Sequence, residues 1–374
     1  MRREGVVAVT GWIALAGFAV PLAAQARFYP TTAVTTGVEA RRYSFGAGFG
    51  AASIRQVAAP LAIVVPVGRR FAIDVGTAIA ATRVTRSDGS FAELNQITDT
   101  QVRASYIFGR DVAVVTVMVN LPTGDEEISV AEFAVTSAIA SPFLSFPVST
   151  YSSGTSVTGG VAVAQPLGPW NVGLAGSLRL NSKYEPFVDA PEPFTYREGL
   201  EGRVRFAAER LVGSTSLAMG LTYSTHGQDE FQRGSISLGG YQSGDRLVAE
   251  FGMSGPVGGG TLTGYIWNYH RFAARDSVDL GVANRENVVA AGLSGSFPLG
   301  RSVELQPGLE GRIWSPDRGT GRLLGLSTAL AIRPADRFAV VPEGRIDAGS
   351  FETQAGRSIT VTGWGFSLFI RYSL

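Results

Sequence analysis

The sequence contains no cysteine, two histidines and a single lysine, Lys183, among its 374 residues. The absence of cysteine excludes disulfide bonds, thiolate metal sites and a cysteine nucleophile. The body of the chain also has no apolar run of about 18 residues, which excludes a bundle of membrane-spanning helices. Charged residues make up 17% of the chain and hydrophobic residues 45%. Because a disordered chain carries far less apolar surface, we expect a folded protein.

The N-terminal segment has the pattern of a secretory signal peptide. Two arginines follow the initiator methionine, Val6–Val20 is apolar but too short to span a membrane, and Ala24–Ala26 is a small-residue cleavage site. We expect residues 1–26 to be removed and residues 27–374 to form one domain. The leader holds two arginines and one glutamate, so 30 basic and 30 acidic side chains remain of the 32 and 31 in the full sequence. This balance gives no electrostatic reason to expect a nucleic-acid partner.

From Phe71 onward the sequence alternates between apolar and polar residues in stretches of strand length. In residues 200–210, for example, Leu200 and Phe206 fall on one face, whereas Glu201 falls on the other. Because a strand points successive side chains to opposite faces, each stretch predicts a strand with one apolar and one polar face.

Short and long connections alternate between these stretches. Seven tight turns built on glycine, proline or aspartate lie at residues 66–73, 108–114, 166–172, 211–217, 256–262, 298–305 and 334–340. Longer polar connections lie between them, at residues 85–99, 122–153, 186–196, 227–244, 274–286, 315–321 and 349–357. Short turns on one rim and long loops on the other are typical of outer-membrane barrels, whereas soluble β-sandwiches follow no such rule.

The turns also predict the number of strands. Seven short turns join fourteen strands in pairs, and the N- and C-terminal segments add one strand each, which makes sixteen. Residues 34–65 fit either one long strand or two strands with a turn near Gly48–Gly50. We therefore predict an all-β fold, a transmembrane antiparallel up-and-down β-barrel of about 14 to 16 strands, with a short helix in one long extracellular loop.

The C-terminal stretch alternates without a break from Trp364 through Phe366, Leu368, Ile370 and Tyr372 to the final residue. This pattern resembles the C-terminal assembly signal of Gram-negative outer-membrane β-barrels. The resemblance implies the bacterial outer membrane as the location. It also implies outer-membrane lipid and the barrel-assembly machinery as partners.

The longest connection, residues 122–153, carries a helix signal. Ser129 and Glu132 have the spacing of a capping box, and Pro142 disfavours helical geometry at the residue before it, so the helix is expected to end near Ala140. The segment is unusually apolar for a loop, and we interpret it as a plug that folds into or over the barrel mouth and binds ligands. Its candidate ligand-binding residues are Phe133, Ile139, Phe143, Leu144 and Phe146. The alternative, that these side chains only pack the loop against the rim, is equally compatible with the pattern.

The polar faces of the predicted strands carry a second candidate site. Arg179, Lys183, Arg203 and Arg205 form a basic patch, and acidic residues including Glu310 and Glu343 face the same lumen. Such rings select ions in pores. With balanced charge, we favour the alternative that arginines and carboxylates neutralise one another and hold the barrel shape.

Aromatic residues near the predicted strand ends are interpreted as interfacial girdles at the level of the lipid headgroups. They are Tyr106, Trp170, Tyr184, Tyr223, Trp267, Tyr269, Trp314 and Trp364. Some of them are also candidates to line a ligand path.

Enzymatic activity is not expected. The only histidines are His226 and His270. Ser224 and His226 lie two apart on one predicted strand, and that spacing of about 7 Å is poor for a nucleophile and its base. No cluster of metal-ligating residues stands out, so we expect no metal and no cofactor.

Two passages carry a more specific resemblance. The LPTG sequence at Leu121–Gly124, which leads from a strand into the helical loop, and the NSKYEPF sequence at Asn181–Phe187 are similar to outer-membrane transport barrels for hydrophobic compounds. These are the long-chain fatty-acid transporter family and the barrels associated with aromatic-hydrocarbon degradation. The resemblance implies passive uptake of a small hydrophobic or amphipathic ligand. A general diffusion porin and a structural or surface-interaction barrel are the alternatives, and the substrate, the oligomeric state and the openness of the lumen are left open.

Overall fold

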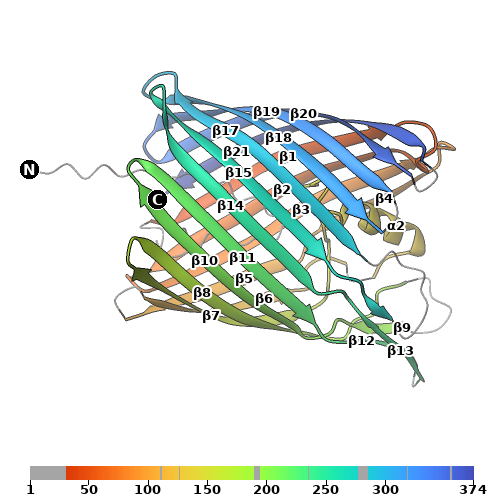
Figure 1. Ribbon diagram of the computed structural model, residues 1–374. Coiled ribbons are helices and arrows are strands. Elements are labelled where there is room, and N and C mark those ends of the chain that lie inside the picture. The colour runs from red at the N-terminus through yellow and green to blue at the C-terminus, as the bar shows by residue number, and fades with distance from the viewer. Residues whose placement is uncertain are drawn as a thin grey trace, which may run out of the picture.

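The computed structural model describes residues 31–109, 112–125, 127–188, 194–234, 236–276, 285–317, 319–353 and 356–374. The predicted signal peptide and its cleavage site lie outside these residues. Sixteen antiparallel strands form one closed barrel (Figure 1). The predicted fold class is therefore confirmed.

In order around the barrel, the strands are β1 (Ala33–Phe45), β2 (Ala51–Val67), β3 (Phe71–Arg86), β5 (Thr100–Phe108), β6 (Ala113–Leu121), β7 (Ser156–Leu167), β8 (Trp170–Asn181), β10 (Glu201–Val212), β11 (Thr215–His226), β14 (Arg246–Val257), β15 (Gly260–Arg271), β17 (Glu286–Pro298), β18 (Val303–Pro316), β19 (Thr320–Ala335), β20 (Phe338–Glu352) and β21 (Ser358–Ser373). The barrel closes because β21 pairs with β1 along its length, from Ala33 opposite Ser373 to Phe45 opposite Val361. The ring of sixteen strands thereby closes without an open sheet edge in the membrane-spanning wall.

Residues 34–65 belong to two strands, which settles the alternative that the sequence left open. β1 and β2 are joined at residues 46–50, where Gly48 has φ +100° and Gly50 has φ +70°. These left-handed values favour glycine and allow the chain to reverse tightly. With this turn, the strand count reaches the upper end of the predicted range.

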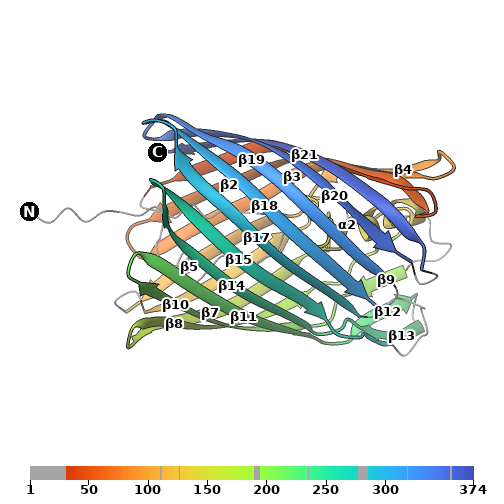
Figure 2. The ribbon, with the colours of Figure 1, turned by 45° about the horizontal axis from the view of Figure 1, so that its top comes forward.

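The two rims differ in loop length as predicted, but two of the seven expected long connections are short, because β18 runs to Pro316 with β19 starting at Thr320, and β20 runs to Glu352 with β21 starting at Ser358. The seven short connections lie at the rim near both ends of the described chain, and the long connections lie at the opposite rim (Figures 1 and 2). In outer-membrane barrels the short turns are periplasmic and the long loops extracellular, and we name the rims accordingly.

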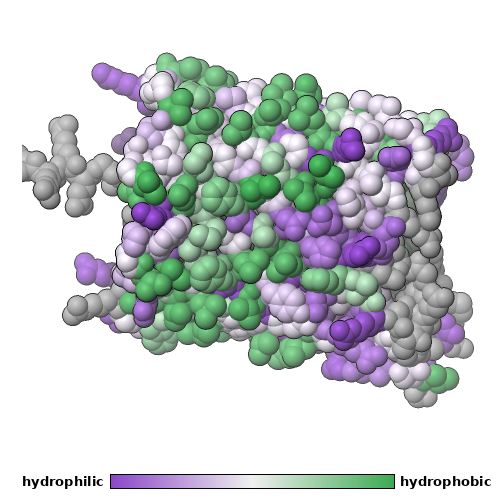
Figure 3. All heavy atoms as spheres, in the orientation of Figure 1, coloured by the Kyte–Doolittle hydropathy of each residue, from purple (hydrophilic) through white to green (hydrophobic). Residues whose placement is uncertain are grey.

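Alternation along the strands separates an apolar outer face from a polar lumen. Side chains such as Val161, Leu178, Leu324 and Ile346 are exposed on the outside. Figure 3 shows one such face, where apolar side chains gather over the wall and hydrophilic ones gather toward the extracellular rim. In the part of the chain that the structure describes, no helix is both long enough and apolar enough to cross a membrane.

Two additions at the extracellular rim were not predicted. β4 (Phe91–Ile97) pairs with β3 and lengthens the wall beyond the point where β5 leaves it. A separate four-stranded sheet, the outer sheet, has the order β9 (Phe194–Arg197), β12 (Asp229–Arg233), β13 (Ile236–Gln242) and β16 (Arg275–Asp276). It ties together three of the long loops.

The girdle interpretation holds for some aromatic residues and is wrong for others. Tyr106, Tyr223 and Trp364 are exposed on the outer face. Trp267, Tyr269 and Trp314 instead pack against the buried apolar cluster inside the barrel. They share the strand face of inward-pointing residues, and the plug provides the apolar surroundings that we had attributed to lipid.

Candidate functional site

A plug loop, residues 122–155, begins with the predicted helix. The helix α2 (Val130–Ile139) lies at the extracellular end of the barrel (Figure 1). The Ser129 hydroxyl accepts a hydrogen bond from the Glu132 amide at 3.3 Å, and the Glu132 carboxylate accepts one from the Ser129 amide at 2.7 Å. The predicted capping box is therefore confirmed, and Ala140 is the C-cap.

The apolar residues of the plug loop divide into a buried set and an exposed one. Ile139, Phe143, Leu144 and Phe146 are almost completely buried, whereas Phe133 is 52% exposed. The buried side chains reach a ligand only if the loop moves. That all five bind ligand stays a prediction.

Aromatic packing fixes the buried part of the loop to the wall. The Phe143 ring lies 5.9 Å from the Trp314 ring and 5.3 Å from the Phe351 ring, and the Phe146 ring meets Tyr43 edge-on at 5.5 Å. Such ring pairs stabilise beyond the area that they bury. The segment after α2 is therefore a packed plug.

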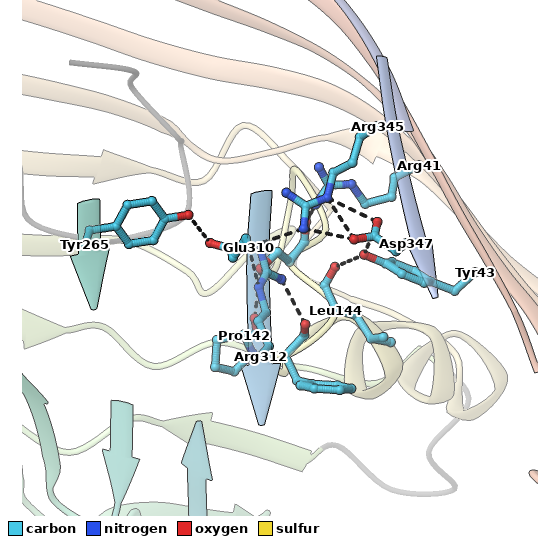
Figure 4. Close-up of polar contacts among 11 residues, drawn as sticks. Arg41, Tyr43, Pro142, Leu144, Tyr265, Glu310, Arg312, Arg345 and Asp347 are labelled. Carbon is cyan, nitrogen blue, oxygen red and sulfur yellow. Dashed lines mark hydrogen bonds and ion pairs between the residues drawn. The ribbon is translucent and has the colours of Figure 1, made fainter. Parts of the chain in front are cut away.

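Three wall side chains hold three consecutive carbonyl groups of this segment (Figure 4). Arg312 donates to the Phe143 oxygen at 2.9 Å, Tyr43 donates to the Leu144 oxygen at 2.8 Å, and Arg41 donates to the carbonyl oxygen of the next residue, Ser145. We call Arg41, Tyr43 and Arg312 the wall clamp. The wall clamp donates hydrogen bonds to buried carbonyl groups that belong to no helix or sheet.

A network of charged groups supports the wall clamp. Glu310 accepts from the Nε of Arg312 at 2.7 Å and from the Tyr265 hydroxyl at 2.6 Å. Arg345 lies 3.2 Å from Glu310 and 2.9 Å from Asp347, which in turn faces Tyr43 (Figure 4). Each charge is paired, as buried charges must be.

Glu343 lies next to this network. With Glu39, Arg41 and Arg345 it surrounds a small space of about 30 Å³. Of the two predicted acidic lumen residues, Glu310 thus lies within the network and Glu343 at its edge.

A second anchor holds the loop on the other side. Gln56 exchanges two hydrogen bonds of 2.8 Å with the backbone of Val148, and Asn120 donates to Asp99 at 2.7 Å and to the Gly154 oxygen at 2.9 Å. The plug loop is therefore bound to β1, β18 and β20 through the wall clamp and the ring contacts, and to β2 and β6 through the second anchor.

The predicted basic residues of the lumen are neutralised. Arg203 lies 2.7 Å from Glu201, Arg205 lies 2.7 Å from Glu250, and Arg179 lies 3.8 Å from a carboxylate in the loop after β8, that of Glu198. This matches the charge-balancing interpretation.

Lys183 does not join the lumen arginines. It lies beyond Asn181, the last residue of β8, in an extracellular loop. There its ammonium is 3.6 Å from Glu230 and 3.1 Å from Gln232 of the outer sheet. The prediction placed it in the lumen because it continues the alternation of the strand, but the strand ends first.

An aromatic row crosses the barrel mouth above the plug. Phe133 of α2 lies 5.9 Å from Phe187, which lies 6.0 Å from Phe194; Phe231 lies 5.9 Å from Phe194 and 5.0 Å from Tyr196. We call these five residues the aromatic row. All are partly or fully exposed. Of these residues, only Phe133 was predicted from the sequence. The other four lie in two different loops, and the outer sheet brings these loops together.

The lumen opposite the wall clamp is lined by small side chains. Inward positions of β7 and β8 include Thr158, Gly160, Ala162, Ala175 and Ser177, each partly exposed. Their outward neighbours are large and apolar. The plug therefore packs against one side of the lumen, and the inward positions opposite it carry mostly small side chains.

No catalytic or metal site is apparent in the described residues. His226 has its Nε2 4.0 Å from the Glu201 carboxylate, and no group of histidines and acids is arranged to hold a metal ion in this part of the chain. That the protein is not an enzyme stays a prediction.

The closed barrel, its apolar outer face and its charged lumen define a transmembrane β-barrel of the type found in the bacterial outer membrane. No family model matches the chain, and no curated protein matches it in sequence.

Several solved outer-membrane barrels are similar in structure. The chain is 10% identical to a mutant of the monoaromatic hydrocarbon channel TodX, with a TM-score of 0.46, over 93% of this chain and 92% of that one. It is 8% identical to OmpT of Vibrio cholerae, with a TM-score of 0.43, over 92% and 99%. It is 13% identical to an anion-selective porin from Comamonas acidovorans, with a TM-score of 0.40, over 92% and 99%. Because the TM-scores are below 0.5, these similarities do not indicate which of the named activities this protein has.

Proposed function

We propose that the protein admits small hydrophobic or amphipathic molecules passively across the outer membrane, without a cofactor and without enzymatic chemistry. The aromatic row is the observation that carries this proposal. Phe133 of α2 is 52% exposed, and its ring contacts Phe187, the first of four partly exposed rings in the neighbouring loops. Aromatic surfaces of this kind bind apolar molecules with little loss of side-chain entropy.

The plug supports the same function. A wide barrel without a plug would pass any small polar solute, whereas here residues of α2 and the segment after it fill one side of the mouth. An apolar molecule held by Phe133 and Phe187 lies beside the lumen that the small side chains of β7 and β8 line. The proposed path runs from the aromatic row to this small-residue wall.

A general diffusion porin is less well supported. Such a pore selects ions through unpaired charge at a constriction. Arg203 and Arg205 each lie against a carboxylate, so the lumen offers little net field there. A structural or surface-interaction barrel is the remaining alternative, for which the outer sheet is the surface of interest.

A double substitution in the aromatic row tests the proposal. Phe133→Ala with Phe187→Ala removes two rings at the mouth, and Phe272→Ala removes an exposed ring outside the row. Uptake of naphthalene into liposomes that contain the full barrel is expected to fall at least threefold in the double variant. The Phe272→Ala control is expected to match the native protein. Equal uptake in all three proteins would contradict the proposal.

Planar-bilayer conductance separates the alternatives. The intact protein is expected to be nearly silent, and deletion of Ser129–Ser145 is expected to produce steady conductance. A large ohmic conductance in the intact protein would favour the porin. Silence in both proteins, with the deleted form still folded by its heat-dependent gel mobility, would favour a structural barrel.

A further inference from the structure

Three arginines lie side by side on the outer face of the barrel. Arg42 of β1 is opposite Arg55 of β2, and Arg55 is opposite Arg83 of β3. We call them the outer arginine row. Because adjacent strands are about 4.8 Å apart, the three Cα atoms lie within about 10 Å of one another across the strands. They point outward, since Tyr43 and Gln56, their neighbours in sequence, are buried inside.

The row lies at the upper edge of the apolar belt. On β21 the outward side chains run from Tyr372 at the periplasmic end to Trp364, which is 49% exposed and lies opposite Arg42. Eight residues of strand cover about 27 Å, or about 20 Å along the membrane normal after strand tilt, close to the height of an outer-membrane apolar band. Beyond Trp364 the outward positions on this strand are two threonines and a serine.

The outward residues of the neighbouring strands β2 and β3 also place the outer arginine row at the upper edge of the apolar belt. On β2 the outward residues below Arg55 include Val57 and Leu61, and on β3 Ile79 lies below Arg83. The nearby hairpin of β3 and β4 projects from the extracellular rim (Figure 2). The outer arginine row therefore sits at the headgroup level of the outer leaflet.

The charge of the row is not balanced within the described residues. Glu93 of β4 lies 3.8 Å from Arg55 and contacts Arg83, whose guanidinium also lies 4.3 Å from the centre of the Phe91 ring. Arg42 has no ion pair or hydrogen bond with any residue that the structure describes. One carboxylate thus pairs with two of the three guanidinium groups and leaves Arg42 without one, and like charges directly opposite on a sheet repel. In the lumen, by contrast, Arg203 and Arg205 each have a carboxylate of their own.

We propose that the outer arginine row binds the phosphate groups of the phosphorylated glycolipid of the outer leaflet. The guanidinium fork matches phosphate oxygens in pairs, and an anion between Arg42 and Arg55 relieves their repulsion. The acyl chains of the same lipid then lie on the apolar side chains below, such as Val57 and Ile79. This site lies outside the lumen, so it does not depend on what the barrel transports.

A charge-removing variant with a matched control tests this site. Arg42→Gln with Arg55→Gln removes the two arginines of the row that Phe91 does not cover. Arg69→Gln with Arg70→Gln removes two exposed arginines from the first periplasmic turn. The full barrel in detergent is titrated with diphosphoryl lipid A, and binding is read by native mass spectrometry. Unchanged heat-dependent gel mobility shows that each variant is folded.

Diphosphoryl lipid A is expected to bind the native barrel and the periplasmic-turn control equally, and the row variant at least tenfold more weakly. Lipid A from which both phosphates have been removed is expected to bind all three proteins weakly and alike. Equal binding of diphosphoryl lipid A to the row variant and the control would overturn the proposal. It would also be overturned if inorganic phosphate alone raised the unfolding temperature of the native barrel as much as the lipid does.

Discussion

Tyr43 illustrates how a single hydroxyl group holds the plug. It is completely buried, donates to the Leu144 oxygen at 2.8 Å and lies 3.3 Å from Asp347. Tyr43→Phe leaves the buried Leu144 carbonyl without its partner, at an expected cost of about 1–3 kcal/mol to plug docking. We expect more frequent opening events in single-channel recordings. Tyr106→Phe, on the exposed outer face, is the matched control, and opening at the control frequency would show that the hydroxyl does not hold the plug.

Asp229 gives the outer sheet a pH dependence. Burial raises the pKa of this carboxyl group, which is 6% exposed, although the Gly199 amide and the Tyr196 hydroxyl oppose the shift by donating to it. A folded-state pKa above the unfolded value of about 4 means that ionisation costs stability. The contribution of the protonated Asp229 carboxyl group to the stability of the outer sheet is therefore full below about pH 4, and it is lost as the pH rises through the raised pKa.

Hydrogen exchange of the β9 and β12 amides, corrected for intrinsic rates, checks this sign. Protection is expected to be greater at pH 4 than at pH 7.5 in the native protein, and Asp229→Asn is expected to flatten the difference. Asp88→Asn, at the tip of the β3–β4 hairpin, is the control. Greater protection at the higher pH would contradict the assigned direction.

At the scale of elements, the capping box stabilises the first turn of α2. Ser129→Ala removes the acceptor for the Glu132 amide and is expected to destabilise the helix by about 1 kcal/mol. Ser137→Ala is the control on the same helix, because the Ser137 hydroxyl only bonds back to the Phe133 carbonyl. Exchange of the α2 amides is expected to rise about fivefold in the first variant and to stay unchanged in the second. Equal exchange in both would show that packing alone sets the stability of the helix.

The elements predicted correctly are those set by local chemistry. Turn residues and alternation are properties of neighbouring residues, so the strand count, the two rims and the Ser129–Glu132 cap followed from the sequence. The inward orientation of Trp314 was not predicted. Alternation places Trp314 on the inner face of its strand, but the apolar plug that it packs against comes from a loop about 170 residues away in the sequence, as the Arg312–Phe143 hydrogen bond shows. The aromatic row was missed for the same reason, since pairing between β9 and β12 and the bridge between Ile128 and Phe187 bring its members together from different loops.

At the scale of the whole molecule, the lumen is an arrangement of paired charges around a plug. Arg205 is nearly buried and lies 2.7 Å from Glu250 and 2.9 Å from the Thr222 hydroxyl, so its charge is neutralised within the wall. The same holds for Arg312 and Arg345 beside Glu310. An opened pore of this kind should discriminate weakly between cations and anions, because fixed charges act on permeating ions only where they are uncompensated.

Glu250→Gln tests that arrangement in the chain with Ser129–Ser145 deleted, which is expected to conduct. The substitution leaves Arg205 without its carboxylate, and the reversal potential in a KCl gradient is expected to shift toward chloride, by about a twofold change in the permeability ratio. Glu352→Gln makes the same change in net charge on an exposed residue at the extracellular rim and is expected to leave the potential unchanged. An equal shift in both variants would mean that net charge alone sets selectivity. A shift confined to Glu250→Gln would place the selective field at the paired arginine, because only there does the lost carboxylate uncover a charge that faces the lumen.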